Sequence, residues 1–115
     1  MKDVSNRAAI NVSPKEMFKT WAELYNDSSA EELASRVKEK HVYLIDLYLG
    51  QSLKDIIEPY FTKIFENELM LWNVIEHEWP ENRNVDVFLD WFEVSISDDV
   101  FDLESGKITT EEDGW

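Results

Sequence analysis

The sequence predicts a single α+β domain: a small mixed or antiparallel sheet of three to four strands, packed against one long kinked helix and two to three shorter helices. Residues 8–12 and 41–47 combine β-branched, aromatic and aliphatic side chains at strand length. Apolar residues recur at steps of three and four over residues 53–75, which is typical of a helix. Only three Gly and three Pro occur in 115 residues, without a linker or a repeat. We therefore expect one domain over residues 1–110 and an acidic tail over residues 111–115.

The first strand and helix are predicted from a start signal between them. A strand over Ala8 to Val12 is followed by Ser13-Pro14-Lys15-Glu16, a capping box with proline at the first helical position. Apolar side chains then recur at helical spacing until about Asn26, which is predicted to end the helix. The inward face of this helix is predicted to hold Met17, Phe18, Trp21, Leu24 and Tyr25.

A second helix and the central strand are predicted to follow. Ser29 with Glu32 forms another capping box, and it predicts a short helix with inward residues Leu33, Ala34 and Val37. The dense apolar run from His41 to Leu47 is too short for a helix of its own, so we expect the central strand there.

Pro59 falls inside the longest helical pattern. Proline removes one backbone amide from a helix interior and costs about 3 kcal/mol there, so the helix either kinks or begins again at this residue. We favour a kink, because the apolar phase continues through Pro59 without a break.

The last third of the chain is predicted to form a short helix and a strand pair. Asn84 is predicted to cap a helix with Val85, Phe88, Trp91 and Phe92 inward. Val94 and Ile96 alternate as in a strand, and after a bulge at Asp98-Asp99 we expect Phe101 and Leu103 to continue the inward face. Residues 104–107 then predict a hairpin turn leading to a strand over residues 108–110.

All of the net charge lies in the last two thirds of the chain. Residues 1–40 contain seven basic and seven acidic side chains, whereas residues 41–115 contain four basic and eighteen acidic ones, which gives the formal net charge of −14. Such a surface repels nucleic acid and anionic membranes and attracts basic protein surfaces. We therefore expect a basic protein partner, no nucleic acid and no membrane.

The sequence predicts a binding face over residues 76–104. In the longer stretch between Lys63 and Lys107, twelve acids occur with Arg83 as the sole cation. On the predicted short helix, Asp86, Asp90 and Glu93 are spaced for one side without an interleaved cation, although like charges at this spacing destabilise a helix. An immunity protein or a nucleic-acid mimic would suit this size and charge. The predicted binding residues are Glu76, Glu78, Trp79, Glu81, Arg83, Asp86, Asp90 and Glu93.

Other interpretations of the same residues stay open, and one is that the excess of acids only keeps the surface solvated. The triplet Glu76-His77-Glu78 contains metal-ligand types, so a small metal-dependent hydrolase using His77 and nearby carboxylates is one alternative. A homodimer with Trp79 or Trp115 at its interface is another. The structural interpretation of Arg83 is an ion pair with a neighbouring carboxylate that fixes the loop after Trp79-Pro80.

The composition of the chain also limits the functions that it can have. The chain has no cysteine, which excludes disulfides and thiolate metal sites. Residues 1–12 contain no apolar segment typical of a signal peptide, and no apolar run reaches membrane length. With three Gly and no GxSxG, P-loop or GxGxxG motif, the sequence predicts a soluble, cytoplasmic, non-enzymatic protein without a cofactor, monomeric or homodimeric.

The last two thirds of the chain carry an aromatic pattern. It comprises a VYLI-type strand over Val42 to Ile45, IF-x-x-EL-x-x-W over Ile64 to Trp72, WP-x-x-R over Trp79 to Arg83, F-x-x-WF over Phe88 to Phe92, and V-x-DL over Val100 to Leu103. In this pattern the chain resembles a family of short acidic bacterial proteins of uncharacterised function. The resemblance implies a shared core, since the residues are mostly aromatic and aliphatic, and it implies no activity.

Overall fold

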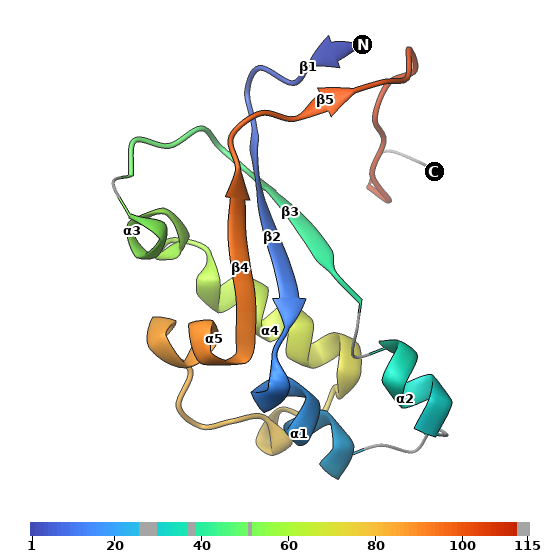
Figure 1. Ribbon diagram of the computed structural model, residues 1–115, viewed down its shortest axis with the longest axis vertical. Helices are drawn as coiled ribbons and strands as arrows, with labels where there is room; N and C mark the ends of the chain where they lie inside the picture. The colour runs from blue at the N-terminus through green and yellow to red at the C-terminus, as the bar shows by residue number, and fades with distance from the viewer. Residues whose placement is uncertain (26–29, 37–38, 51, 113–115) are drawn as a thin grey trace.

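Strand β2 (Ala8–Pro14) lies at the centre of a three-stranded antiparallel sheet in this computed structural model. It pairs on one side with β3 (His41–Ile45) and on the other with β4 (Phe92–Ser97), so the strand order is β3-β2-β4. Ile10 lies opposite Tyr43 on one neighbour and Ile96 on the other. The structure describes residues 1–25, 30–36, 39–50 and 52–112. The α+β class expected from the sequence is therefore confirmed (Figure 1).

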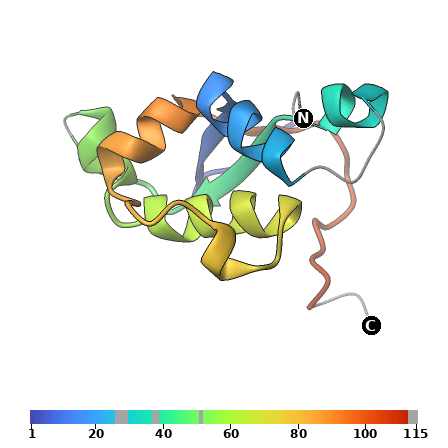
Figure 2. The same ribbon diagram turned by 90° about the horizontal axis from the view of Figure 1, so that it is seen from below.

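Helices surround one end and one face of this sheet. Helix α1 (Glu16–Leu24) and α2 (Ala30–Arg36) connect β2 to β3, and α3 (Leu53–Ile57) and α4 (Phe61–Trp72) follow β3. A short 3₁₀ turn η1 (Glu76–Glu78) leads to α5 (Val85–Trp91) and then to β4. Seen from below, α1 and α5 lie above α4 and η1 in the view (Figure 2), and Phe88 of α5 packs against Phe65 of α4.

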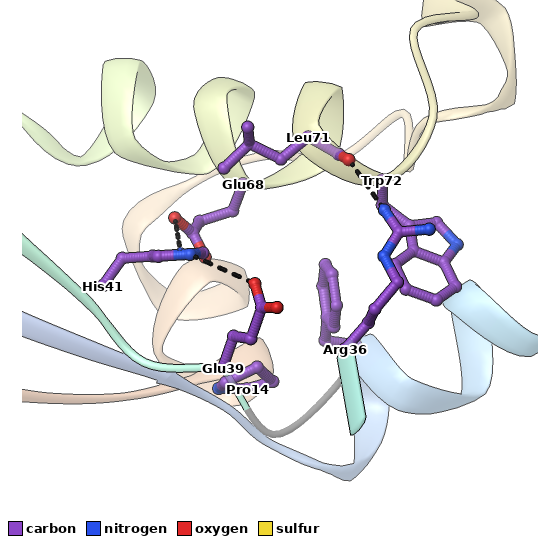
Figure 3. Close-up of a pocket in the computed structure, with 8 residues that line it drawn as sticks. Pro14, Arg36, Glu39, His41, Glu68, Leu71 and Trp72 are labelled. Atoms are coloured by element: carbon purple, nitrogen blue, oxygen red, sulfur yellow. Dashed lines mark hydrogen bonds and ion pairs between the residues drawn. The ribbon is translucent and has the colours of Figure 1, made fainter. Parts of the chain in front are cut away.

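A buried carboxylate on helix α4 binds side chains of β3. Glu68, which is 4% exposed, lies on α4 and contacts His41 of β3 (Figure 3). It also contacts Tyr43 of the same strand. Because an unpaired buried charge is strongly unfavourable, these two partners are what make Glu68 compatible with the interior.

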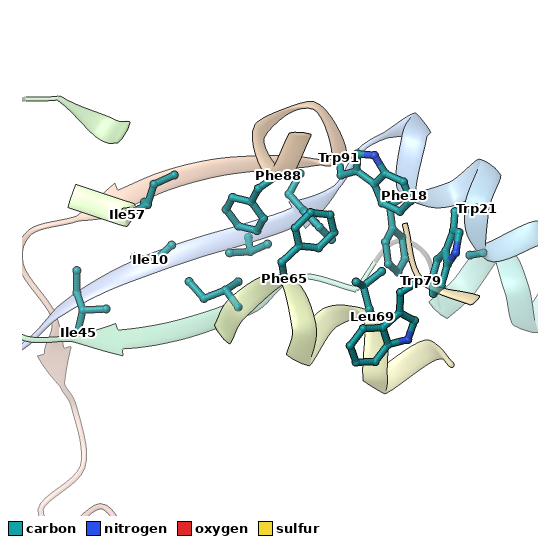
Figure 4. Packing of buried hydrophobic residues seen from close by; sticks show 14 of the residues in the cluster. Ile10, Phe18, Trp21, Ile45, Ile57, Phe65, Leu69, Trp79, Phe88 and Trp91 are labelled. Atoms are coloured by element: carbon teal, nitrogen blue, oxygen red, sulfur yellow. The ribbon is translucent and has the colours of Figure 1, made fainter. Parts of the chain in front are cut away.

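The core is an aromatic cluster between β2, α4, α5 and β4. Phe65, Phe88 and Phe92 are fully buried, and their ring centroids are 5.3 to 5.7 Å apart in tilted and edge-on arrangements. Trp91 and Phe18 extend this cluster toward α1 (Figure 4). The predicted inward face of α5 is confirmed, and so is its cap, since the Asn84 side chain accepts a hydrogen bond from the Val87 amide at 2.9 Å.

Three predictions about the middle of the chain are wrong. The run at His41 forms an edge strand, because β2 pairs on both sides and occupies the centre. Instead of one kinked helix, α3 and α4 are separate helices joined by a turn at Glu58–Tyr60, since the proline cannot donate the amide that would continue α3. Helix α4 ends at Trp72, before Ile75, which was predicted to lie on the inward face of this helix.

The capping box predicted at Ser13 is also wrong. Pro14 stays in β2 opposite Phe92, and the helix begins at Glu16 with Lys15 as its N-cap and without a side-chain cap. The Lys15 amide donates instead to the Trp91 carbonyl at 2.8 Å, so pairing with the end of α5 extends the strand past the expected start signal.

The C-terminal region differs from the expected strand pair. Strand β5 (Phe101–Asp102) pairs antiparallel with β1 (Lys2–Asp3) in a separate two-stranded sheet, and residues 108–110 are not a strand. Phe101 and Leu103 are exposed rather than inward, because the chain leaves the three-stranded sheet after Ser97. Asn26, Ser29, Val37 and Trp115 lie outside the described residues.

We expect the Phe88→Ala variant to lose about 3–5 kcal/mol of unfolding free energy, because it leaves a cavity at a fully buried ring. Phe101→Ala removes the same atoms at an exposed position and should change that free energy by less than about 0.5 kcal/mol. Urea unfolding followed by tryptophan fluorescence measures both. Equal losses in the two variants would contradict this description of the core.

Candidate functional site

An open groove lies where α4 ends. Its volume is about 490 Å³, and the residues that line it are Leu24, Tyr25, Trp72, Asn73, Val74, Ile75 and Glu78. We call this surface the Trp72 groove. It is formed by the end of α1, the end of α4 and the segment that leads into η1.

Three indole N–H groups fix the walls of the groove. Trp72 Nε1 donates to the Ala22 carbonyl at 3.1 Å, which joins α4 to α1. Trp21 Nε1 donates to the Glu78 carbonyl at 2.9 Å, and Trp79 Nε1 donates to the Asn73 carbonyl at 2.7 Å. Each bond joins a large apolar ring to a backbone carbonyl of another element or turn. The groove is thus held by segments far apart in the sequence.

The rim of the groove is apolar and exposed. Leu24 is 73% exposed, Val74 75% and Ile75 48%. Helical periodicity placed Leu24 and Ile75 in the predicted core, but α1 and α4 end beside them. The Asn73 side chain accepts a hydrogen bond from the Ile75 amide at 2.9 Å, which turns the chain out of the helix direction. Apolar residues at helical spacing did not end where the helices end. This mismatch was the signal available for predicting the surface, and the sequence analysis missed it.

The predicted acidic binding residues lie on different sides of the molecule. Glu76 is exposed on η1, and Glu78, half-buried there, accepts a hydrogen bond from the Asn73 side chain. Asp86 and Asp90 are exposed on α5, which lies on another side than η1 (Figure 2). Glu93 is exposed on β4 rather than on the helix. The acids after β4 lie near β5 at the far end of the long axis (Figure 1).

Trp79, Arg83 and Asp86 have structural roles in the folded chain. Trp79 is buried in the core, so its ring is not an exposed anchor. Arg83 donates to the Pro80 carbonyl at 2.6 Å and lies over the Trp79 ring, so it fixes the predicted loop through a carbonyl and not a carboxylate. Asp86 forms an ion pair with Lys54 of α3. Glu81 is exposed in the same loop.

A second cavity, of about 40 Å³, lies between α2, β3 and α4 (Figure 3). His41 Nδ1 is 2.9 Å from both oxygens of Glu68, and His41 Nε2 is 3.7 Å from the Glu39 carboxylate. Arg36 lies over the Trp72 ring at 4.3 Å and donates to the Leu71 carbonyl. The charged groups therefore bind one another or the backbone, and we interpret this cluster as structural.

Tyr43 completes the hydrogen-bond network of Glu68. Its hydroxyl donates to a Glu68 oxygen and accepts from the Asn67 side chain at 2.9 Å. Burial, reinforced by the bond to Glu68 and by the charge of Glu68, raises the pKa of the Tyr43 hydroxyl above its ordinary range. Sequence analysis missed the network because its members come from β3 and α4, which only the tertiary fold brings together.

Within the described residues, no group of three or more histidine and acidic side chains is placed to hold a metal ion, and His77 is exposed on η1. None of the helices in these described parts of the chain is both long and apolar enough to cross a membrane.

Comparison with models of known families, with curated proteins and with solved structures finds no match to this chain. The resemblance to short acidic bacterial proteins therefore stays a prediction.

The unfolding free energy should fall with rising alkaline pH more steeply in the wild type than in Tyr43→Phe. A raised pKa means that the folded state favours the neutral hydroxyl, so its contribution is complete below about pH 10 and is lost above it as the unfolded chain ionises first. Urea unfolding at a series of alkaline pH values measures the difference. Parallel curves for the two proteins would contradict the buried bond to Glu68.

Proposed function

We propose that this protein is a non-enzymatic binding protein that engages a basic protein partner through the Trp72 groove. The single observation behind the proposal is an exposed apolar rim, made by Leu24, Val74 and Ile75, beside the acidic side chains of η1. The partner segment that fits has an apolar face for the rim and basic residues for the acids.

Apolar exposure at the groove supports a partner. Three large aliphatic side chains gather around one concavity, and contiguous apolar surface with a polar border is typical of interaction sites. Burying such side chains contributes about 25 cal/mol for each square ångström removed from water. The groove therefore offers a source of affinity that does not depend on salt.

The charge of the groove and of the whole chain indicates that the partner is basic. Glu78 lines the groove, Glu76 adjoins it in the sequence, and no lysine or arginine is among the lining residues that the structure describes. The net charge of −14 attracts cationic surfaces over longer distances and raises their association rate at low salt. The distant acids near β5 act in this way without contact.

The rigid framework of the groove also favours binding. The three indole hydrogen bonds fix its walls before a partner arrives, which reduces the ordering that binding would otherwise require. The distribution of acids over several sides gives less support to nucleic-acid mimicry, which would need carboxylates along one face. Within the proposed class, an apolar groove with an acidic border is the better supported mode.

A dye-labelled synthetic helix with leucine on one face and lysine on the other provides a direct probe of the groove. We expect it to bind the wild type with an affinity that falls between low and about 0.5 M salt, as screening requires. Glu76→Lys should weaken binding roughly fivefold, as the loss of a contact of about 1 kcal/mol implies. Fluorescence anisotropy measures each affinity.

Asp99→Lys is the matched control. It changes the net charge by the same amount at an exposed position near the far end of the molecule, so it should affect the affinity less than Glu76→Lys. Val74→Ser should weaken binding at both salt concentrations, because it removes apolar surface from the rim. Equal effects of the two lysine variants, or no binding to the wild type, would contradict the proposal.

A further inference from the structure

One edge of the three-stranded sheet is open along β3. The strand pairs with β2 on one side, and in the part of the chain that the structure describes no strand pairs with its other side (Figure 1). Its register with β2 is regular from His41 to Ile45, without a bulge. The strand also contains no proline or lysine. Proteins commonly protect a free edge with such features, because unpaired backbone groups can accept another strand.

The two faces of β3 differ in their surroundings. His41 and Tyr43 point toward α4, where they contact Glu68, and Ile45 is buried. The alternate residues lie on the opposite face, where Val42 is 63% exposed and Leu44 53% exposed. The open edge is thus bordered on one face by two apolar side chains.

We propose that the open edge of β3 pairs antiparallel with β3 of a second copy of this chain, about a two-fold axis at Tyr43. In this register Val42 lies opposite Leu44 of the second copy, and Leu44 lies opposite its Val42. One residue beyond the strand at each end, Lys40 lies opposite Asp46 of the second copy, and the symmetry repeats each pair.

This register matches both apolar and charged residues. Side chains directly opposite each other in an antiparallel pair are about 5 Å apart, close enough for apolar contact and for an ion pair. Lys40 and Asp46 are both exposed, and the Asp46 side chain is 80% exposed although Arg7 lies 3.2 Å from it. The edge is therefore complementary to itself in charge, which is why a second copy is the occupant that fits.

Other two-fold registers fit less well. An axis at Val42 places Lys40 opposite Leu44 of the second copy. An axis at Leu44 places Val42 opposite Asp46. Among these three, only the register at Tyr43 opposes Val42 to Leu44 and Lys40 to Asp46, and an isologous pairing of this kind closes on itself as a dimer.

Sedimentation equilibrium near physiological salt tests the proposal on the whole chain. A single pair of short strands buries less than the roughly 1,200 Å² of a standard interface, so we expect a monomer–dimer equilibrium that depends on concentration. Val42→Lys places a charge on the edge strand and should weaken the dimer at least tenfold. A wild type that stays monomeric up to about 1 mM, or a dimer that Val42→Lys leaves unchanged, would overturn the proposal.

Charge reversal separates this interface from a loss of folding. Lys40→Asp places two acids opposite each other at both ends of the interface, and Asp46→Lys places two lysines there, so each variant alone should be mainly monomeric. An equal mixture of the two should dimerise again, because every opposed pair is then of opposite sign. Lys107→Asp, which makes the same charge change at a distant exposed site, should leave the wild-type equilibrium unaltered.

Circular dichroism and thermal unfolding of each variant confirm that the chain is folded. A mixture of folded Lys40→Asp and Asp46→Lys variants that remains monomeric would exclude this register. The binding of the lysine-rich probe to the Trp72 groove is measured separately, so failure of one proposal leaves the other distinguishable.

Discussion

The buried carboxylate of Glu68 joins β3 to α4, and the positions of both proposed interaction surfaces depend on that contact. Its charge is compatible with the interior because His41 and Tyr43 of β3 bind it. Removing one partner of such a cluster is strongly unfavourable, since it leaves an uncompensated charge or polar group. The cluster therefore fixes which side of β3 faces the helix. As a consequence, Val42 and Leu44 face outward, and α4 ends where α1 can complete the groove.

The tryptophans have a role that differs from simple core filling. Trp21, Trp72 and Trp79 each place a ring against the interior while the indole N–H donates to a backbone carbonyl. These hydrogen bonds are directional, whereas apolar burial is not, so they fix the relative position of α1, α4 and η1. A surface with defined walls results at a point where helical periodicity alone would predict continuous core.

The large negative charge acts differently in different parts of the molecule. Asp86 pairs with Lys54, Glu68 is buried with its partners, and Glu76 is exposed next to apolar surface. Counting acids along the chain treats these residues alike. Because these surroundings differ, the net charge of the chain indicates only that a partner would be basic. A contact surface is supported only near η1, where an exposed acid lies next to apolar surface.

The sequence alone determined which segments form helices and strands wherever the tertiary packing agreed with the preference of the local residues. The cap at Asn84 and the inward face of α5 follow from residues close together in the chain, and the apolar run at His41 forms a strand, as its residue types predict. Pro59 was recognised as a disruption because proline acts on the backbone of its own helix. The choice between a kink and a break was seen only in the structure, where α3 ends at Ile57 and α4 begins at Phe61.

Strand order, the partners of Glu68 and the exposure of Val74 were decided by the tertiary structure. β2 became the central strand because two segments distant in the sequence pair with it, and no local pattern specifies that competition. Pro14 remained in β2 for the same reason, since its pairing with Phe92 prevailed over a local helix start. Apolar periodicity records which residues can be buried. Which of them are buried depends on what packs against them, and that is a property of the whole fold.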